Sequence, residues 1–426
     1  MPSSGVAARR TGGPKITEAK STGRQPGGRF GIWRVASALA ILRVGATLPT
    51  PLYVIYRETF QFSTLTLTLI FSVFVAGSLG ALFFLGRLAD QIGRRRVMLP
   101  AIGLTGIAAL LFLIAQDEIM LGAARLLSGL AIGVAAGAGT AWIVELEPDH
   151  DRRRATLITV IVTMAGVGAG PLIAGLLADF APWPLRLPYI FYLGLLVLVA
   201  VLAYSGSETA TKPVTELRNL SVRPRIGVPH EIRAEFIAPA LTAFATFALL
   251  GFYTSLVPSL IKNSLGVRSY TVNGAVVFEL YVFAIATVLL WRNLESRAAM
   301  VRGLALLLPT LGLLVLTREV QSLPVLLCDS ALAGVAVAFG YRGSLQVATE
   351  IAPDEARAEI LSSYYIAAFA GAAMPVIGVG LLERWLNADL ANIIFAATIG
   401  AFAILALIIG ARNGGAAAVK TVQTPR

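Results

Sequence analysis

The sequence predicts an all-α polytopic membrane protein whose twelve transmembrane helices form two six-helix bundles related as a parallel repeat. Three observations support this: the composition is strongly apolar, the apolar residues gather in twelve long runs, and one segment recurs 205 residues later. The 426 residues are 56% hydrophobic and 14% charged, with a mean hydropathy of +0.76, whereas soluble domains carry roughly 25% charged residues. This composition excludes an ordinary soluble enzyme of the same length.

Each apolar run is long enough to cross a hydrocarbon core, which takes roughly 20 helical residues. The runs in the first part of the chain lie at 35–56, 64–86, 97–116, 119–143, 155–177 and 187–205. Those in the second part lie at 236–260, 273–291, 300–317, 323–347, 360–382 and 391–411. We expect helices because lipid offers no partners to unpaired backbone groups, and the alternating pattern of a barrel strand is absent.

The polar segments divide the chain into domains. Residues 1–34 are Gly-rich and basic, and we expect a disordered cytoplasmic tail there, with no short apolar segment typical of a cleaved signal peptide. Residues 206–235 form a cytoplasmic linker between the six-helix bundles at 35–205 and 236–411, and residues 412–426 form a second cytoplasmic tail.

The charge distribution predicts the orientation of the helices. With both termini in the cytoplasm, 26 of the 35 Lys and Arg residues fall on the cytoplasmic side and six on the opposite side. Positively charged loops stay inside, so we expect a multi-pass protein of the plasma or inner membrane. The same rule explains the net charge of +11 without a nucleic-acid partner. One cysteine and two histidines argue against a disulfide framework or a metal site, and we expect no cofactor.

The repeated segment follows two of the apolar runs, those at 119–143 and 323–347. The pattern E-x-x-P-D-x-x-R begins at Glu145 and again at Glu350, and it ends at Arg152 and Arg357. The same ungapped alignment pairs further glycines, namely Gly129 with Gly334, Gly166 with Gly371 and Gly175 with Gly380. Six spans separate the copies, so both cross the membrane in the same direction, as in the two halves of many transporters.

The stretch GRLADQIGRRR at 86–96 places an acid and four arginines in one short loop. It resembles the G-x-L-A-D-R-x-G-R-K-x-x-L loop between spans two and three of the major facilitator superfamily. The matching positions include Gly86, Asp90, Gly93 and Arg94, with Arg95 in the Lys position and Gln91 in place of Arg. The resemblance implies that this loop latches the two halves in the outward-facing state. A plain positive anchor would explain the arginines but neither Asp90 nor the glycines.

Two further segments carry the resemblance. LGAARLLSG in span four matches a family pattern at Arg125, and GVGAGPLIAG in span five matches the G-x-x-x-G-P-x-x-G-G pattern of proton-coupled exporters at Gly166, Gly170 and Pro171. Small residues spaced by four allow close helix packing. The resemblance implies export. Glu145, Arg152, Glu350 and Arg357 are expected to act in gating, and solvated rim charges are the alternative.

Ionisable residues inside spans are costly and are therefore candidates for function. Glu279 and Asp329 are the candidates for proton coupling, and a structural ion pair is the alternative for Glu279. Arg43, Arg125 and Arg342 are candidates for the substrate cavity, where an arginine can hold an anionic group. Snorkelling or pairing with carbonyls is the alternative for Arg43 and Arg125. Three tyrosines are further candidates for the substrate cavity because of their position in the spans, namely Tyr281, Tyr364 and Tyr365.

The leading functional hypothesis is a secondary transporter that moves a small organic solute by alternating access and exports it in exchange for protons. The alternative is a symporter or uniporter that imports a small anionic metabolite. An enzyme would need a catalytic cluster, which the sequence does not contain. The expected partners are the lipid bilayer, a small-molecule substrate and protons, and the expected state is a monomer.

Overall fold

The computed structural model describes residues 28–86, 88–147, 151–206, 208 and 226–422, with the side chains of 28–30, 152 and 412–422 left outside this description. Its helices in the first half of the chain are α1 (Gly28–Thr47), α2 (Tyr53–Phe60), α3 (Thr64–Leu85), α4 (Leu88–Ile92), α5 (Arg94–Leu113), α6 (Glu118–Leu146), α7 (Arg152–Phe180) and α8 (Leu187–Tyr204). Those in the second half are the short 3-10 helix η2 (His230–Ile232) and the helices α9 (Arg233–Ser255), α10 (Val257–Asn263), α11 (Tyr270–Leu290), α12 (Ser296–Val320), α13 (Leu323–Glu350), α14 (Arg357–Leu382) and α15 (Ala388–Val422).

The all-α membrane fold is confirmed. Eleven helices in the described part of the chain are long and apolar enough to cross a membrane. The remaining expected span, at 35–56, corresponds to α1 followed by α2, with a break between Thr47 and Tyr53. Pro49 and Pro51 lie in that break, where a fixed φ and a missing N–H donor prevent a continuous helix.

Several helices extend beyond the apolar runs. α1 begins at Gly28, inside the tail expected at 1–34, and α9 begins at Arg233, inside the linker expected at 206–235. α15 continues to Val422, well into the tail expected at 412–426. Hydropathy detects only the part of a helix that lies in hydrocarbon, whereas the intrahelical hydrogen bonds can continue into water. The helices therefore begin or end outside the apolar runs, and the domain boundaries stay a prediction.

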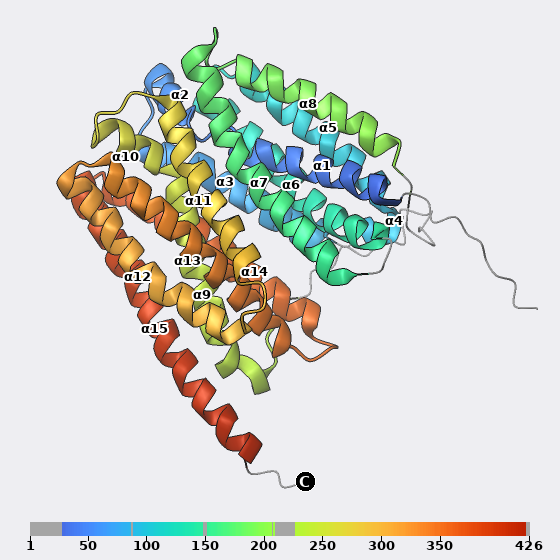
Figure 1. The fold of residues 1–426 in the computed structure, drawn as a ribbon. Coiled ribbons are helices and arrows are strands. Elements are labelled where there is room, and N and C mark those ends of the chain that lie inside the picture. The colour runs from blue at the N-terminus through green and yellow to red at the C-terminus, as the bar shows by residue number, and fades with distance from the viewer. Residues whose placement is uncertain (1–27, 87, 148–150, 207, 209–225, 423–426) are drawn as a thin grey trace, which may run out of the picture.

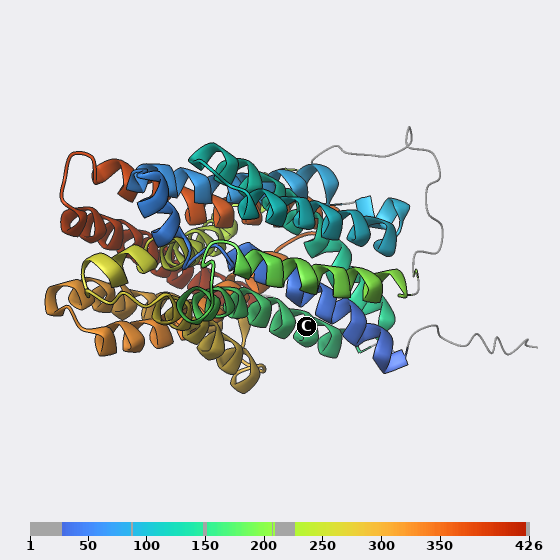
Figure 2. The same cartoon turned by 90° about the horizontal axis from the view of Figure 1, so that it is seen from above.

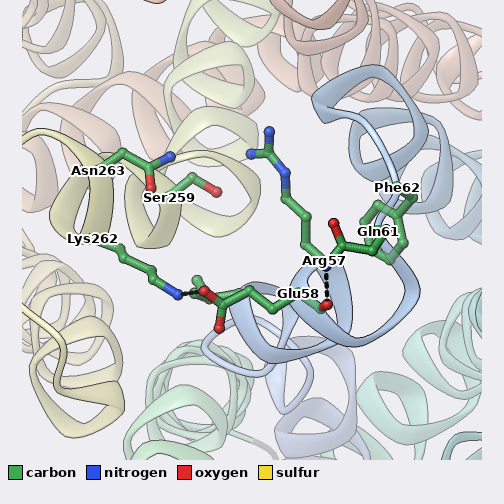
Figure 3. Close-up of a pocket in the computed structure, with 8 residues that line it drawn as sticks. Arg57, Glu58, Gln61, Phe62, Ser259, Lys262 and Asn263 are labelled. Carbon is green, nitrogen blue, oxygen red and sulfur yellow. Dashed lines mark hydrogen bonds and ion pairs between the residues drawn. The ribbon is translucent and has the colours of Figure 1, made fainter.

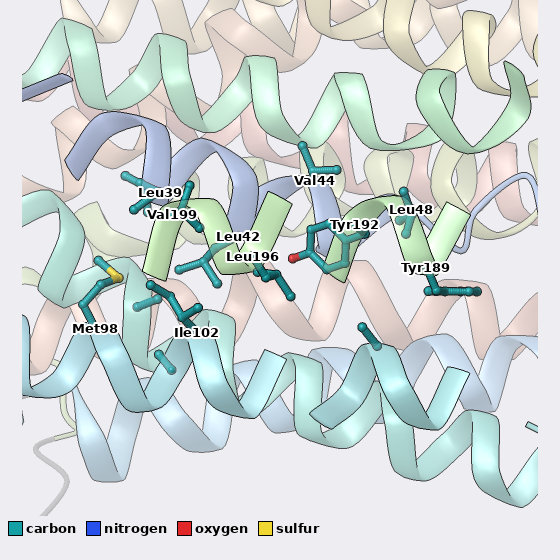
Figure 4. Packing of buried hydrophobic residues seen from close by; sticks show 14 of the residues in the cluster. Leu39, Leu42, Val44, Leu48, Met98, Ile102, Tyr189, Tyr192, Leu196 and Val199 are labelled. Carbon is teal, nitrogen blue, oxygen red and sulfur yellow. The ribbon is translucent and has the colours of Figure 1, made fainter. Parts of the chain in front are cut away.

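The two halves of the chain lie side by side (Figures 1 and 2), and each has its own apolar core. The core of the N-terminal half, which we define as α1–α8, joins α1, α5 and α8 through residues such as Leu42, Ile102 and Leu196 (Figure 4). The core of the C-terminal half, η2–α15, joins α9, α11, α12, α13 and α15. We infer that each half packs largely within itself.

The glycines paired by the internal repeat make equivalent contacts in the two halves. A Cβ added at Gly129 of α6 would lie 2.3 Å from the Phe74 carbonyl oxygen of α3, and one at Gly334 of α13 would lie 2.2 Å from the Leu280 carbonyl oxygen of α11. Only glycine permits two helix backbones to approach this closely. The repeat therefore records one helix-packing arrangement used twice.

Most of the contact between the halves comes from two helix pairs: α7 packs against α11 (Figure 1), and α3 packs against α14. We call the end of the bundle that holds α4 the motif end, and the end that holds α2 and α10 the far end. The repeat also pairs Gly175 with Gly380, and both lie where the halves meet at the far end. An added Cβ would lie 2.2 Å from the Tyr270 carbonyl oxygen or 3.0 Å from Leu65 Cα, respectively.

Candidate functional site

Arg94 organises the motif end. Its Nη1 donates to Asp90 Oδ1, and its Nη2 donates to Glu145 Oε1 at 2.8 Å. The Arg94 side chain is 11% exposed, whereas that of Asp90 is 61% exposed. Both acids belong to the N-terminal half, so the Asp90–Arg94–Glu145 cluster ties α4, α5 and α6 together within one half.

Glu208 completes this cluster. Its carboxylate accepts hydrogen bonds from the backbone N–H groups of Arg94 at 2.8 Å and of Arg95 at 3.1 Å, at the start of α5. An anion is favoured there by the helix dipole. Gly93 precedes α5 with φ 111°, and an added Cβ would lie 2.7 Å from Glu208 Oε2. Glu208 was not singled out in the sequence analysis. The signal was available, because an acid just after a span can accept hydrogen bonds from the N-terminus of a helix at the same membrane surface.

Arg95 and Gly86 have local roles. Arg95 Nη1 donates to the carbonyl oxygens of Tyr204 and Gly206 at 3.3 and 3.4 Å, at the end of α8. A cation at a helix C-terminus is favoured by the unpaired carbonyls there. Gly86 caps α3, and its N–H donates to the Leu82 carbonyl at 3.2 Å.

The second copy of the repeat is simpler. Glu350 accepts a hydrogen bond from Ser296 Oγ at 2.6 Å, at the start of α12, in the position that Arg94 occupies for Glu145. Arg357 pairs with Asp354 at 3.0 Å, and both side chains are at least half exposed. Such a pair contributes little, which favours the rim-charge alternative for Arg357. The side chain of Arg152 and the residues Pro148 and Asp149 lie outside the described part of the chain.

We expect Asp90→Asn to slow transport severalfold while leaving substrate affinity unchanged. The substitution removes the negative charge that pairs with Arg94, and it touches neither the interior of the bundle nor the far end. Initial transport rates and equilibrium binding, measured on the same preparation, test this. Asp354→Asn is the matched control, because Asp354 is an exposed acid that pairs with an arginine at the same end. Lost binding in a folded Asp90→Asn protein would make Asp90 a substrate ligand.

Asp179 links the two halves at the far end. Its carboxylate, near the end of α7, accepts from Ser269 Oγ at 2.7 Å and from the backbone N–H groups of Tyr270 at 3.0 Å and Thr271 at 2.8 Å. It therefore caps α11 from the opposite half. Sequence reasoning missed this contact, because the two partners lie about 90 residues apart.

A second polar link closes the far end beside a cavity of about 320 Å³ (Figure 3). Glu58 of α2 pairs with Lys262 of α10 across the two halves, and Arg57, Ser259 and Asn263 also line the cavity. Burial, and then the charges of Arg268 and Arg57, lower the pKa of Lys262. The Glu58 carboxylate supplies the opposite charge in this basic surrounding.

The glycine and proline residues of α7 pack against both α1 and α11. Added Cβ atoms at Gly166 and Gly170 would lie 2.2 and 2.4 Å from carbonyl oxygens of α1, and Gly274 of α11 packs on the Pro171 carbonyl oxygen. Pro171 has no N–H, so the Val167 carbonyl lacks its helical donor. Thr47 Oγ1 donates to that carbonyl at 2.6 Å. These residues therefore pack the middle of α7 closely against α1 and α11.

Among the described residues, fewer of the polar contacts given between the halves lie at the motif end. Arg153 Nη2 donates to Asn293 Oδ1 there, beside the packing of α7 on α11. The Asp90–Arg94–Glu145 cluster binds within its own half. The described polar bridges between the halves thus lie mainly at the far end.

Arg125 and Arg342 use their guanidinium groups inside single halves. Arg125 is 1% exposed and donates to Tyr53 Oη and to the Ala46 carbonyl oxygen at 2.7 Å. Arg342 donates to the carbonyl oxygens of Trp291 and Arg292 at 2.6 and 2.7 Å, where α11 ends. These contacts fit the pairing with carbonyls expected as the alternative for Arg125, and we do not retain either arginine as a substrate ligand.

Arg43 differs from both. It lies on α1, is half-buried, and is close enough to Tyr281, Tyr341 and Tyr365 of the opposite half for its charge to act on their hydroxyl groups. Tyr364 is instead buried inside the C-terminal half, where its hydroxyl meets Ser344 Oγ at 2.8 Å. Tyr341 was missed because only the tertiary fold brings it to the interface.

The two intramembrane acids lie on neighbouring helices. Glu279 of α11 accepts a hydrogen bond from Oγ of Ser330, which lies on α13. Asp329, which precedes Ser330 on the same helix, accepts a hydrogen bond from Tyr253 Oη at 2.7 Å. Asp329 is fully buried, and its Oδ1 has no hydrogen-bond partner among the described residues. The acids therefore lie on helices that pack together, and each is bonded to a hydroxyl group.

The comparison with known families decides the class of this arrangement. The family described as Major Facilitator Superfamily matches residues 35–374. The chain belongs to the major facilitator superfamily. Members of this family are multi-pass membrane transporters and not enzymes, and the resemblance noted in the loop at 86–96 is confirmed at the level of the family.

Individual relatives are distant. This chain is 25% identical over 214 residues to an uncharacterised MFS-type transporter of Mycobacterium tuberculosis strain H37Rv. The alignment covers 50% of this chain and 27% of that protein. The chain is also 25% identical over 202 positions to the multidrug resistance protein MdtL of Escherichia coli, covering 46% and 49%. The aligned part thus spans about a quarter to a half of these relatives.

Proposed function

We propose that this transporter works by alternating access and exports a small organic solute in exchange for protons. The observation that carries the proposal is the unequal joining of the two halves. Asp179 and the Glu58–Lys262 pair bridge them at the far end, whereas the Asp90–Arg94–Glu145 cluster binds within one half at the motif end. A protein that closes one end at a time needs separate contacts of this kind.

The orientation follows from charge. The motif end is the basic side of the chain, so we place it in the cytoplasm, together with both termini. The structure would then be closed to the outside. The bacterial relatives favour the inner membrane as the location, and we propose that the transporter acts as a monomer, because each half packs on its own apolar core.

Proton coupling is assigned to Glu279 and Asp329. A carboxylate buried in a membrane protein without a facing cation is costly, and a bound proton removes that cost. Asp329 Oδ1 is such an unpartnered atom among the described residues, and Glu279 is half-buried and bonded to the adjacent Ser330. These surroundings support the two acids as the proton-coupling residues.

Export is supported by the resemblance of the Gly166–Gly170–Pro171 stripe to a pattern of proton-coupled exporters, and by the name of the distant relative MdtL. Import of an anionic metabolite is the second candidate. Arg43 favours the anionic part of this candidate and not a direction of transport, because a cation at the interface of the halves suits an anionic solute.

Inside-out membrane vesicles test the proposal. We expect an acidic lumen to drive accumulation of a fluorescent or radiolabelled solute, a matching alkalinisation of the lumen, and loss of both signals with a protonophore. Vesicles from cells with the empty vector provide the background. Accumulation that is independent of the proton gradient would remove antiport, and solute movement only toward the cytoplasm would favour the importer.

A further inference from the structure

We propose that Arg43 is an anion-binding group at the joint between the two halves, and that the transported solute carries a carboxylate, sulfonate or phosphate on an aromatic body. This inference rests on the proposed transport function and goes further by naming the chemical class of the solute. It follows from the position of Arg43, from the lack of a protein partner for its charge, and from the aromatic wall that faces it.

Arg43 lies at the centre of the joint between the halves. A Cβ added at Gly166 of α7 would lie 2.8 Å from Arg43 Cβ, and one added at Gly168 would lie 2.8 Å from Tyr281 Cβ of α11. Two glycines less than one turn apart on α7 thus admit a cation from one half and a phenol from the other. The charge of Arg43 also reaches Tyr341 of α13 and Tyr365 of α14.

The charge of Arg43 has no partner within the described residues: neither a hydrogen bond nor an ion pair joins its guanidinium to the protein. The other two arginines within spans are each held by carbonyl oxygens. The two acids within spans are bonded to hydroxyl groups, Glu279 to Ser330 and Asp329 to Tyr253. An unpaired cation inside a membrane protein is costly, and the side chain stays partly accessible. An anionic solute would pair with it directly.

The opposite wall is aromatic. The ring of Phe247 lies 5.5 Å from that of Tyr341 and 6.1 Å from that of Phe369, and Tyr365 lies 6.3 Å from Phe369. Each of these four residues is partly accessible. Such rings can stack on a flat apolar body, and the tyrosine hydroxyls can donate hydrogen bonds to an anion. The site therefore combines an anion-binding group with a surface for an aromatic ring.

The test uses the full-length protein in a neutral detergent without anionic lipid. The probes are aryl carboxylates, sulfonates and phosphates, each with a neutral ester or amide and a cationic amine of the same skeleton. Binding is measured by thermal shift and then by calorimetry. We expect stabilisation by anions alone, and a loss of affinity on the order of tenfold to a hundredfold in Arg43→Gln. Arg43→Lys should retain part of the affinity, because it keeps the charge but not the planar fork.

Arg384→Gln is the matched control, because it removes an exposed arginine of the C-terminal half far from Arg43, and it should bind like the wild type. A separate arm adds anionic lipid: competition with the aryl anions would assign the same pocket to a lipid headgroup and overturn the solute assignment. The inference is also overturned if no anion binds, if neutral or cationic probes bind best, or if Arg43→Gln binds unchanged.

The two proposals fail in different ways. Arg43-dependent binding without solute movement in vesicles would contradict the transport function and leave the anion site standing. Proton-driven export of a cation that is unaffected by Arg43→Gln would leave the function standing and overturn the anion site.

Discussion

Glu279→Gln is expected to abolish proton-coupled transport while the protein still folds and binds its solute. Glutamine keeps nearly the same shape and can still accept the hydrogen bond from Ser330, but it cannot gain or lose a proton at neutral pH. The substitution leaves Asp329 on the adjacent helix α13 unchanged. We therefore expect the apolar packing of the C-terminal half to stay intact. The loss should therefore concern coupling and not folding.

Purified protein in liposomes with a trapped pH-sensitive dye measures this effect. The wild type should show proton movement that accompanies the solute, and Glu279→Gln should show none above empty liposomes. Ser330→Ala is the matched control, since it removes the hydrogen bond but keeps the acid, and we expect reduced but measurable coupling. Full coupling in Glu279→Gln would exclude Glu279 and leave Asp329→Asn as the next test.

Gly175→Ala is expected to open the far end and to stop transport. The added Cβ would lie 2.2 Å from the Tyr270 carbonyl oxygen and 2.7 Å from the carbonyl carbon. Backbone atoms cannot rotate away as a side chain can, so α7 and α11 must separate. Overpacking of this kind costs about 1–3 kcal/mol, and 1.4 kcal/mol changes the balance between two conformations about tenfold. Gly274→Ala should act alike, because its Cβ would lie 2.2 Å from the Pro171 carbonyl oxygen.

Modification of a single cysteine placed at Asn273, which lines a far-end cavity, reports this opening once Cys328 is replaced by serine. The cysteine should react faster with a membrane-impermeant maleimide in Gly175→Ala than in the parent. Gly378→Ala is the control, since no atom lies within 4 Å of its Cβ position. Equal reaction rates together with normal transport in Gly175→Ala would show that the far-end seal is not part of the cycle.

The sequence predicted those features that depend on local pattern. Apolar runs of membrane-spanning length located the helices, and the repeat located Gly129 and Gly334, whose packing is equivalent in the two halves. The interaction of Glu145 with the arginines after span two was also predictable, because an acid and a basic cluster were both expected at the same membrane surface. Helix ends were less predictable, since α15 continues past its apolar part.

Long-range partners could not be predicted from the sequence. Arg43, Arg125 and Arg342 look alike in the sequence, as single arginines in apolar runs. Only the fold shows that carbonyl oxygens hold two of them and that Arg43 faces tyrosines of the other half. The contact of Asp179 with the start of α11 could not be predicted either, because it depends on how the halves meet.

Distances between spin labels at both ends of the bundle test the central claim, that the two halves open one end at a time. One label pair is placed at Glu118 and Gln321 of the far end, and another at Arg96 and Asp354 of the motif end, all of which are exposed. Electron–electron double resonance is recorded in nanodiscs in alkaline and in acidic buffer. We expect one distance to lengthen as the other shortens. Distances that stay fixed at both ends, or that lengthen together, would contradict alternating access.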